Sequence, residues 1–304
     1  MEKVGFIGTG IMGKPMAANL ISSGFRLNIF ARHPEKVKDL EEKGARFFDT
    51  IKGMSQESRV IITMLPDSPD SREVIIGGAG IIDGAGEGTL VIDMSSIDPI
   101  ASIEIGKKLA EKKISFMDAP VSGGEEGAVK GELAIMAGGS KADFKRAEPL
   151  FRAMGRSYIL TGNTGAGNFT KLANQIMVAA NIAAMGEAFV LAGKAGLSLE
   201  TVYHAVKSGL AGSNVLDSKA PRVFAGDYKP GFTIGLHHKD IRNALNAADS
   251  LGVPLPLTAF MSEVLKSLMA SGYSDLDHGA IIKFFEKISG DDIYKCKHQA
   301  DFNG

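Results

Sequence analysis

The run Val4-Gly5-Phe6-Ile7 leads directly into Gly8-Thr9-Gly10-Ile11-Met12-Gly13, and a helical pattern follows over residues 11–23. This order of strand, glycine-rich turn and helix is the context in which the spacing G-x-G-x-x-G indicates a dinucleotide site. The first glycine allows a tight turn, the second lets backbone approach a pyrophosphate, and the third lets helix pack on strand. The helix N-terminus then offers unpaired N–H groups to the phosphates. The stretch therefore predicts that Gly8, Thr9, Gly10, Ile11, Met12 and Gly13 bind a dinucleotide, the alternative being a purely structural turn.

Outward from this turn, continuous apolar runs alternate with helical patterns through the first half of the chain. Strands are predicted over residues 4–7, 27–30, 45–48, 60–65, 90–94, 114–117, 133–137 and 157–160, and helices over 11–23, 35–43 and 99–112. Such alternation is typical of an α/β domain with a parallel sheet that helices cover on both faces. With the glycine turn at its first strand, this domain is expected to be a Rossmann domain.

The second half of the chain has no convincing alternation of strands and helices. A long helical pattern covers residues 169–195 and contains many small residues, and further helices are predicted over 200–208, 236–251, 257–271 and 279–287. We therefore expect an NAD(P)-binding Rossmann domain over residues 1–163 and an all-α substrate and oligomerisation domain over 164–304. The long helix is expected to be an interdomain helix and the central strut of the second domain.

Composition limits the classes of partner. The chain has 304 residues, with 34 Lys plus Arg and 35 Asp plus Glu, so its formal net charge is −1. This balance lacks the basic excess of a nucleic-acid binder, and no nucleic-acid partner is expected. The most membrane-like stretch, 176–193, contains Asn181 and Glu187, so it predicts a buried helix and no membrane partner. A single cysteine, Cys296, and the lack of a targeting segment favour a reducing, cytoplasmic location.

The end of the second predicted strand bears on the choice of dinucleotide. An acidic residue at this place binds the ribose 2′-OH of NAD, whereas a nearby arginine suits the 2′-phosphate of NADP. Here the strand over 27–30 is followed by Ala31-Arg32-His33, without a carboxylate and with a guanidinium at once. The sequence therefore favours NADP, contacted by Arg32. NAD stays open, because stacking of Arg32 on an adenine ring would suit either cofactor.

Four motifs occur in an order that resembles one known family. They are Gly5-Phe6-Ile7-Gly8-Thr9-Gly10-Ile11-Met12-Gly13, Asp118-Ala119-Pro120-Val121-Ser122-Gly123-Gly124, Gly165-Ala166-Gly167-Asn168-Phe169-Thr170-Lys171-Leu172-Ala173-Asn174, and Lys239-Asp240. Together they resemble the β-hydroxyacid dehydrogenase family, which includes 3-hydroxyisobutyrate dehydrogenase, and the resemblance covers essentially the whole chain. It implies an NAD(P)-dependent oxidoreductase acting on a CH–OH group, with an active site between the two domains. It also implies a homodimer or homotetramer.

The resemblance implies that Lys171 is the catalytic lysine, and the chemistry of aldehyde reduction agrees independently. Hydride transfer to a carbonyl carbon builds negative charge on the oxygen, and a positioned ammonium stabilises that charge and supplies a proton. Asn174 lies three positions later, so it shares a helix face with Lys171 and can hold the lysine or a substrate oxygen. Taken alone, Lys171 would be read as an exposed helix charge; the four motifs together favour the catalytic role.

The resemblance also implies the remaining contacts. Ser122, Gly123 and Gly124 are expected to hold the substrate carboxylate, because a turn of small residues exposes N–H groups that can bind an anion. Met64, Leu65 and Pro66 stand at the end of one predicted strand, and Ser96 follows another. All four are expected to contact the cofactor, Leu65, Pro66 and Ser96 at its nicotinamide half, and Lys239 to reach toward it from the helical domain. The alternatives are a plain turn at Ser122 and an exposed charge at Lys239. No metal site is expected, because the adjacent His237 and His238 do not share a helix face.

The substrate is expected to be a small semialdehyde or hydroxyacid that bears a carboxylate. The stretches Leu210-Ala211-Gly212-Ser213, Lys219-Ala220-Pro221 and Lys229-Pro230-Gly231-Phe232 are similar to family members that interconvert tartronate semialdehyde and D-glycerate. The alternatives are 3-hydroxyisobutyrate, 4-hydroxybutyrate or a related semialdehyde of the same family. An alternative of another class is a dinucleotide-binding module without activity, which the presence of Lys171, Asn174 and Ser122 disfavours.

Overall fold

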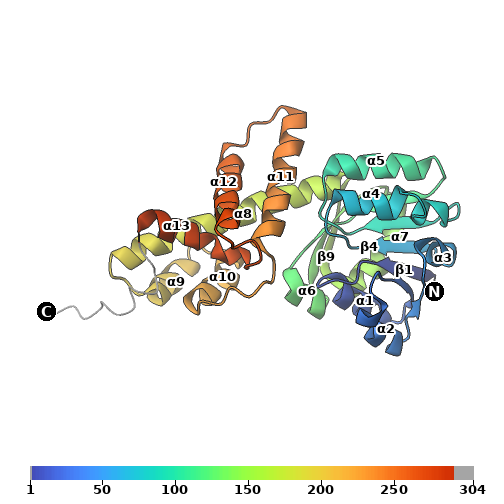
Figure 1. Cartoon of the computed structure of the whole chain (residues 1–304), viewed down its shortest axis with the longest axis horizontal. Coiled ribbons are helices and arrows are strands. Elements are labelled where there is room, and N and C mark those ends of the chain that lie inside the picture. The colour runs from blue at the N-terminus through green and yellow to red at the C-terminus, as the bar shows by residue number, and fades with distance from the viewer. Residues whose placement is uncertain (1, 291–304) are drawn as a thin grey trace. The chain divides into compact units, whose positions relative to one another are not determined.

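The computed structural model describes residues 2–290 (Figure 1). Within them the chain divides into two compact units, the first ending at Lys171 and the second beginning at Leu172. The helix that begins at Ala166 contributes residues to both units, and the sequence-based division after residue 163 stays a prediction. Cys296, on which the expectation of a reducing environment depended, lies outside the described residues.

The first unit is built on one sheet, whose strand order is β3-β2-β1-β4-β5-β6-β8-β7, with β9 paired to β8. Strands β1 to β6 pair in parallel, and β8 runs antiparallel to β6 and β7. The predicted parallel sheet is therefore wrong at this edge, because β7 and the short helix α6 return the chain into β8 in the opposite direction. The strands are β1 (Lys3–Ile7), β2 (Arg26–Phe30), β3 (Arg46–Phe47), β4 (Val60–Thr63), β5 (Leu90–Asp93), β6 (Ser115–Asp118), β7 (Val121–Ser122), β8 (Leu133–Gly138) and β9 (Gly155–Gly162).

The strand order contains a switch point between β1 and β4. From β1 the chain adds β2 and β3 on one side, then crosses over to add β4, β5 and β6 on the other. Residues Ile7 and Thr63, which end β1 and β4, lie opposite each other in register. Open α/β sheets bind ligands outside the carboxyl ends of the strands at such a point.

Both faces of the sheet are buried, as the sequence predicts. Along β1, Phe6 packs into one core and Ile7 into the other, and along β4 Ile62 and Ile61 divide in the same way. Helices α1, α2, α6 and α7 supply one core, and α3, α4 and α5 the other. Their bounds are α1 (Gly13–Ser22), α2 (Lys38–Glu42), α3 (Ile51–Gln56), α4 (Ser68–Ile76), α5 (Pro99–Ala110), α6 (Gly124–Lys130) and α7 (Lys141–Met154).

The helix predicted over residues 35–43 is interrupted. A 3-10 turn, η1 (Pro34–Lys36), precedes α2, and Val37 between them has a φ of −119°, which is not helical. Val37 and Leu40 are both fully buried in the core beneath α1 and β2. These two side chains attach the segment to the core, while the backbone leaves helical geometry at Val37.

The regular elements among the described residues of the second unit are all helices, as predicted, apart from one isolated β-bridge between Thr233 and Asp277. Its core gathers buried side chains from all of its helices, among them Ile182, Phe189, Leu216, Ile241 and Leu265. The helices are α8 (Ala166–Lys194), which starts in the first unit, α9 (Leu199–Lys207), α10 (Asn214–Phe224), α11 (Ile234–Leu251), α12 (Pro256–Ala270) and α13 (Ile282–Ser289), with the 3-10 turns η2 (Ile81–Asp83) of the first unit and η3 (His278–Ile281) of the second.

Helix α8 has the length and hydropathy of a membrane span. Among the described residues it is the one helix that passes both criteria, and half of its most apolar window is buried inside the protein. Buried helices of soluble proteins are apolar in the same way. Length and hydropathy of α8 are therefore weak grounds for a membrane location.

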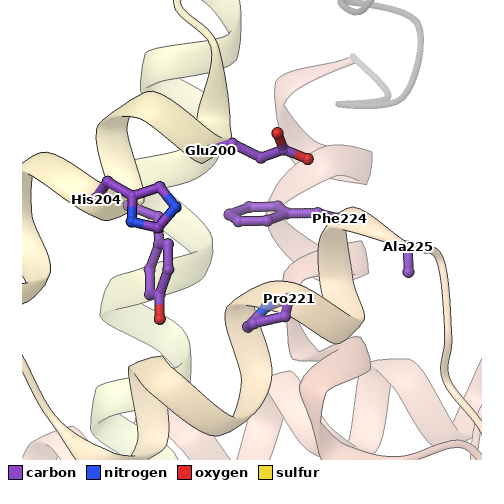
Figure 2. A pocket seen from close by; sticks show the side chains of 6 residues that line it. Glu200, His204, Pro221, Phe224 and Ala225 are labelled. Atoms are coloured by element: carbon purple, nitrogen blue, oxygen red, sulfur yellow. The ribbon is translucent and has the colours of Figure 1, made fainter.

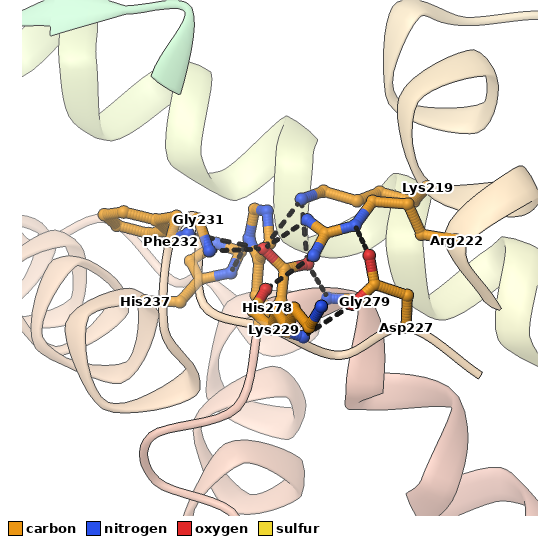
Figure 3. A network of polar contacts seen from close by, with 10 residues as sticks. Lys219, Arg222, Asp227, Lys229, Gly231, Phe232, His237, His278 and Gly279 are labelled. Atoms are coloured by element: carbon orange, nitrogen blue, oxygen red, sulfur yellow. Dashed lines mark hydrogen bonds and ion pairs between the residues drawn. The ribbon is translucent and has the colours of Figure 1, made fainter. Parts of the chain in front are cut away.

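A polar network around Asp277 joins the loop before α11 to α10 and η3 (Figure 3). The buried Asp277 carboxylate pairs with Lys219 at 2.8 Å and Arg222 at 3.3 Å, and accepts hydrogen bonds from the N–H groups of Gly231, Phe232 and Gly279. Burial opposes ionisation of Asp277, but the ammonium of Lys219 and the amide donors outweigh it and hold the pKa of Asp277 below its usual value. The network therefore fixes the loop before α11 with a charged, fully engaged carboxylate.

Candidate active site

The glycine turn after β1 has the geometry that a dinucleotide requires. Gly8 has a φ of +97°, and a Cβ at this position would lie 2.1 Å from the carbonyl oxygen of Met64. A Cβ at Gly13 would lie 1.8 Å from the carbonyl oxygen of Gly8, whereas a Cβ at Gly10 would meet no atom within 4 Å. Gly8 and Gly13 are therefore required by the fold. The open space at Gly10 fits the close approach of a pyrophosphate.

A buried aspartate, Asp93, organises the loops that follow β4 and β5. Its carboxylate accepts hydrogen bonds from the Thr63 hydroxyl at 2.9 Å and from the Ser95 hydroxyl and amide. The Ser95 hydroxyl oxygen in turn accepts from the N–H of Leu65 at 2.7 Å. Burial raises the pKa of Asp93, against the effect of these donors. This network holds the segments that contain the predicted cofactor contacts Met64, Leu65, Pro66 and Ser96 at one edge of the sheet.

Arg32 lies beside the same edge. It follows the end of β2, and Phe30 on β2 is in register with Ile7, the residue that precedes the glycine turn. The side chain is exposed, so its guanidinium is accessible to a ligand. This placement is compatible with a contact between Arg32 and the adenosine ribose of the cofactor. An exposed guanidinium suits the 2′-phosphate of NADP and equally stacking on the adenine of NAD.

Lys171 lies in the first turns of α8, and the start of this helix is held by two buried side chains. The Asp118 carboxylate, at the end of β6, accepts hydrogen bonds from the N–H groups of Gly165 at 2.6 Å and Asn168 at 2.7 Å. The Asn168 side chain accepts from the N–H of Ile97 at 3.1 Å and donates to the Ser102 hydroxyl at 3.0 Å. Lys171 itself is 7% exposed, so it is not the solvated surface charge that the residue type alone suggests.

The expected turn at Ser122 is the junction of β7 and α6. Ser122 ends β7 and is half-buried, while Gly123 and Gly124 are exposed with φ values of +141° and +62°. Residues other than glycine rarely adopt such φ values, so this backbone conformation depends on both glycines. Glu125 and Glu126 follow in the first turn of α6 and already balance part of its helix dipole. A substrate carboxylate would therefore depend on the Ser122 hydroxyl and the glycine amides.

The second unit joins Asn174 and Lys239 through two buried residues. Asn174 donates to the Gln175 side-chain oxygen at 2.8 Å, and the Gln175 amide donates to Asp240 at 2.7 Å. The other oxygen of Asp240 pairs with the Lys239 ammonium at 3.1 Å. Lys239 is therefore a largely buried member of an ion pair, not the exposed helix-start charge of the alternative interpretation.

Sequence reasoning named no role for Asp93, Asp118, Asn168, Gln175 or Asp240. Three of them, Asp118, Asn168 and Asp240, stand inside the quoted motifs, so their position was a usable signal. Asp93 and Gln175 had a weaker one: Asp93 ends a continuous apolar run, and Gln175 follows Asn174. Their partners lie on other elements and become known only from the fold.

Two hollows among the described residues are lined by none of the predicted site residues. One, of 420 Å³, lies in the second unit between α9 and α10 and is lined by Glu200, Tyr203, His204, Pro221, Phe224 and Ala225 (Figure 2). Tyr203 turns its hydroxyl toward Asp217 in a hydrogen bond of 2.9 Å. Aromatic and proline side chains dominate the lining of this hollow.

Comparison with known proteins gives the family. Residues 3–162 match the family described as the NAD binding domain of 6-phosphogluconate dehydrogenase, and residues 165–285 match NAD-binding of NADP-dependent 3-hydroxyisobutyrate dehydrogenase. The chain is 40% identical over 284 residues to the 2-hydroxy-3-oxopropionate reductase of Escherichia coli (strain K12), covering 93% of this chain and 97% of that protein. The chain belongs to the β-hydroxyacid dehydrogenase family.

Further members of the family are similar over almost the whole chain. The 2-(hydroxymethyl)glutarate dehydrogenase of Eubacterium barkeri is 36% identical, covering 95% of this chain and 96% of that protein. The structure of a Mycobacterium tuberculosis 3-hydroxyisobutyrate dehydrogenase with L-serine matches with a TM-score of 0.86 and 30% identity, covering 94% of this chain and 99% of that one.

These similarities confirm the predicted fold class, family and cofactor class. The protein is an NAD(P)-dependent oxidoreductase that acts on a CH–OH group, and its substrates are of the hydroxyacid and semialdehyde class. The named substrates differ from one relative to the next. The family therefore defines the class of substrate, and the residues of the site determine which substrate of that class is used.

Proposed function

We propose that the protein reduces tartronate semialdehyde (2-hydroxy-3-oxopropionate) to D-glycerate. The observation that carries this proposal is the buried Lys171 on a helix whose start is bound to the carboxyl edge of the sheet, the edge that also holds the glycine turn. The choice of substrate rests on the 40% identity to a reductase of that name and on the sequence stretches shared with such enzymes. Relatives named for other substrates make the related semialdehydes the alternative.

The reaction needs a hydride and a proton. The reduced nicotinamide, when bound, supplies the hydride to the carbonyl carbon of the aldehyde. The Lys171 ammonium stabilises the negative charge that grows on the carbonyl oxygen and donates its proton there, which completes the alcohol. In the reverse direction the neutral amine of Lys171 accepts the proton of the alcohol. Burial of Lys171 strengthens the attraction between its ammonium and the negative carbonyl oxygen, because nearby water would screen these charges.

Other residues of the chain orient the substrate and the cofactor. In our proposal the Ser122 hydroxyl and the amides of Gly123 and Gly124 hold the substrate carboxylate. Asn174 orients Lys171 or the substrate, and its bond to Gln175 holds the amide of Asn174 in one orientation. Gly8 to Gly13, Met64, Leu65, Pro66 and Ser96 hold the cofactor, and Lys239 approaches it.

We also propose NADP as the preferred cofactor, with Arg32 on its 2′-phosphate. The exposed guanidinium beside the switch point supports this choice, as does the absence of an acidic residue at Ala31. The proposed cellular setting is the cytoplasm, and the proposed assembly a homodimer or homotetramer. Light scattering of the purified protein would measure the assembly directly.

A panel of semialdehydes tests the proposed reaction. The reaction is monitored as oxidation of NADPH at 340 nm. We expect kcat/KM for tartronate semialdehyde to be higher than kcat/KM for succinate semialdehyde or methylmalonate semialdehyde. Lys171→Ala should lower kcat by about 10² to 10⁴, the usual contribution of general acid catalysis. Lys141→Ala, which removes an exposed lysine at the start of α7, is the matched control and should leave kcat unchanged.

Two outcomes would contradict the proposal, one its assignment of Lys171 and the other its choice of substrate. A Lys171→Ala enzyme that kept more than about a tenth of the kcat would remove the lysine from the chemistry. A higher kcat/KM for another semialdehyde would replace the substrate and leave the reductase mechanism in place.

A further inference from the structure

Asp118 is a buried carboxylate at the start of the helix that holds Lys171. It is fully buried at the end of β6, and its two oxygens accept hydrogen bonds from two backbone amides of the α8 start. The first N–H groups of a helix lack partners within the helix, and a negative charge placed there is favourable. At 2.6 and 2.7 Å both bonds have the short length of charge-assisted hydrogen bonds. Asp118 therefore caps α8 from a strand about fifty residues earlier in the chain.

Two glycines allow this close approach between the helix start and the sheet. A Cβ at Gly138 on β8 would lie 2.6 Å from a carboxylate oxygen of Asp118 and 2.6 Å from the N–H nitrogen of Gly167. A Cβ at Gly167 would lie 2.4 Å from the carbonyl oxygen of Met136. The first turn of α8 is thus packed closely against the ends of β6 and β8, without space for a side chain at Gly138 or Gly167.

The position of this turn determines where Lys171 lies. Lys171 follows Gly165 by six residues, which is about 9 Å along a helix at 1.5 Å per residue. A shift or fraying of the capped turn is therefore transmitted to the lysine with little loss. Misplacement of a reacting group by about 1 Å can cost about a hundredfold in rate.

We propose that Asp118 is a positioning residue for Lys171, which fixes the catalytic ammonium by capping the start of α8 in its ionised form. This inference rests on the proposed role of Lys171. In this role Asp118 acts through Lys171 and makes no contact with substrate or cofactor. Asn168, which joins the same turn to Ile97 and Ser102, supports the cap but bears no charge that could vary.

The ionisation of Asp118 gives the proposal a signature in pH. Burial raises the pKa of Asp118 to about 6, and the N–H donors of Gly165 and Asn168 oppose this rise. Asp93, in register on β5, faces it and raises the pKa further, while β8 presents the glycine backbone at Gly138 and α8 its amides. A buried carboxylate that stays charged at neutral pH costs stability, and such costs are typical of sites that serve function.

The sign follows from the role of each group. Below its pKa, Asp118 binds a proton and keeps one full acceptor oxygen for two amide donors. As pH falls through about 6 the turn is therefore no longer held by two equivalent bonds and Lys171 shifts, although protonation itself favours the folded state. Lys171 as general acid in reduction must be protonated, so its own titration lowers the rate only as pH rises. A loss of kcat on the acid side therefore has to come from another group, and we assign it to Asp118.

Asp118→Asn is the first test, because the amide keeps the shape and leaves one acceptor oxygen. We expect kcat for semialdehyde reduction to fall about ten- to hundredfold while the Kd of NADPH stays the same. Hydrogen exchange of the amides at 165–171 should quicken, and the acid limb of kcat should disappear. Ser140→Ala is the matched control, since Ser140 caps α7 through the N–H of Asp143, and it should change neither kcat nor exchange at α8.

The wild-type enzyme gives a second test that needs no variant. Between pH 7.5 and 5, kcat should fall with a midpoint of about 6, whereas the protection of the amides at 165–171, corrected for the intrinsic pH dependence of exchange, should not fall, because a carboxyl group whose pKa is raised in the folded state favours folding when it is protonated. Asp93→Asn should lower that midpoint, because it removes the neighbouring negative charge, and should not abolish the limb.

Several results would overturn the proposal. They are a kcat of Asp118→Asn within about threefold of wild type, a lowered kcat with unchanged exchange at 165–171, and an acid limb that persists in Asp118→Asn. Failure of the proposed function looks different: Lys171→Ala would then keep its kcat, while exchange in Asp118→Asn, measured without substrate, would still report the cap.

Discussion

At Gly8 and Gly13 an added Cβ would lie 2.1 and 1.8 Å from backbone carbonyl oxygens, and at Gly10 it would meet nothing within 4 Å. Three glycines of one motif are therefore required for two different reasons. The protein itself excludes a side chain at Gly8 and Gly13, and only a ligand can exclude one at Gly10. This contrast separates the stability of the turn from its affinity for the cofactor.

We expect Gly10→Ala to leave the free energy of unfolding nearly unchanged and to weaken NADPH binding about tenfold or more, as overpacking of about 1–3 kcal/mol at the pyrophosphate would. Gly13→Ala should instead lower the free energy of unfolding, because the methyl group collides with the Gly8 carbonyl. Denaturant unfolding and fluorescence titration with NADPH measure the two effects. A Gly10→Ala protein with wild-type affinity would mean that the phosphates bind elsewhere.

The residues that sequence reasoning could name are those whose signal is local. The glycine turn is identified by its spacing after a strand, and the pair Lys171 and Asn174 by a short motif that resembles the family. The caps and relays around them are long-range: Gly165 and Asn168 bond to Asp118, and Gln175 bonds to Asp240. No local pattern contains such a pair, because the fold brings its members together.

At the scale of the elements, the end of β2 bears on the choice between NADP and NAD. Ala31 and Arg32 follow it beside the glycine turn, with Arg32 exposed. Arginine meets a phosphate with paired, charge-assisted hydrogen bonds, and a carboxylate at Ala31 would repel the same phosphate.

We expect a wild-type ratio of kcat/KM for NADPH over NADH above one, and its reversal in Ala31→Asp/Arg32→Ala. Loss of hydrogen bonds to a charged group, about 1.5–3 kcal/mol, predicts a fall in the ratio of about ten- to a hundredfold. Arg26→Ala, at the opposite end of β2 and exposed, is the control that should leave the ratio unchanged. A wild-type ratio below one would reject the preference for NADP and keep the enzyme class.

The elements missed from the sequence have physical reasons in common. Helices α3 and α6 are short and contain glycine, and α7 and α10 contain Pro149 and Pro221 in their interiors, which obscures the helical pattern. Apolar continuity predicted β1, β4 and β5 well because both of their faces are buried. It could not show that β8 runs antiparallel to β6, since strand direction depends on the connection and not on the strand.

At the scale of the whole molecule, the two units contain buried aspartates whose pKa values are shifted in opposite directions. In the first unit, burial raises the pKa values of Asp93 and Asp118, so their protonation favours the folded state. In the second unit, Lys219 and amide donors hold the pKa of Asp277 below its usual value despite burial. Its contribution to stability is present above the unfolded value of about 3.8 and is lost as pH falls through the lower folded value.

The second unit should therefore lose stability first in acid, at the network around Asp277 (Figure 3). At pH 7, Asp277→Asn should cost about 3–5 kcal/mol, because it leaves Lys219 and Arg222 without their shared carboxylate. The gap between variant and wild type should begin to narrow below about pH 4, where Asp277 of the unfolded wild-type chain binds a proton, and should close as pH falls through the lower pKa of the folded state. Asp275→Asn, an exposed neighbour, is the control. Hydrogen exchange resolved along the chain makes the measurement, and earlier loss of protection in the first unit, or a gap that stays constant with pH, would show that the Asp277 pair does not govern acid unfolding.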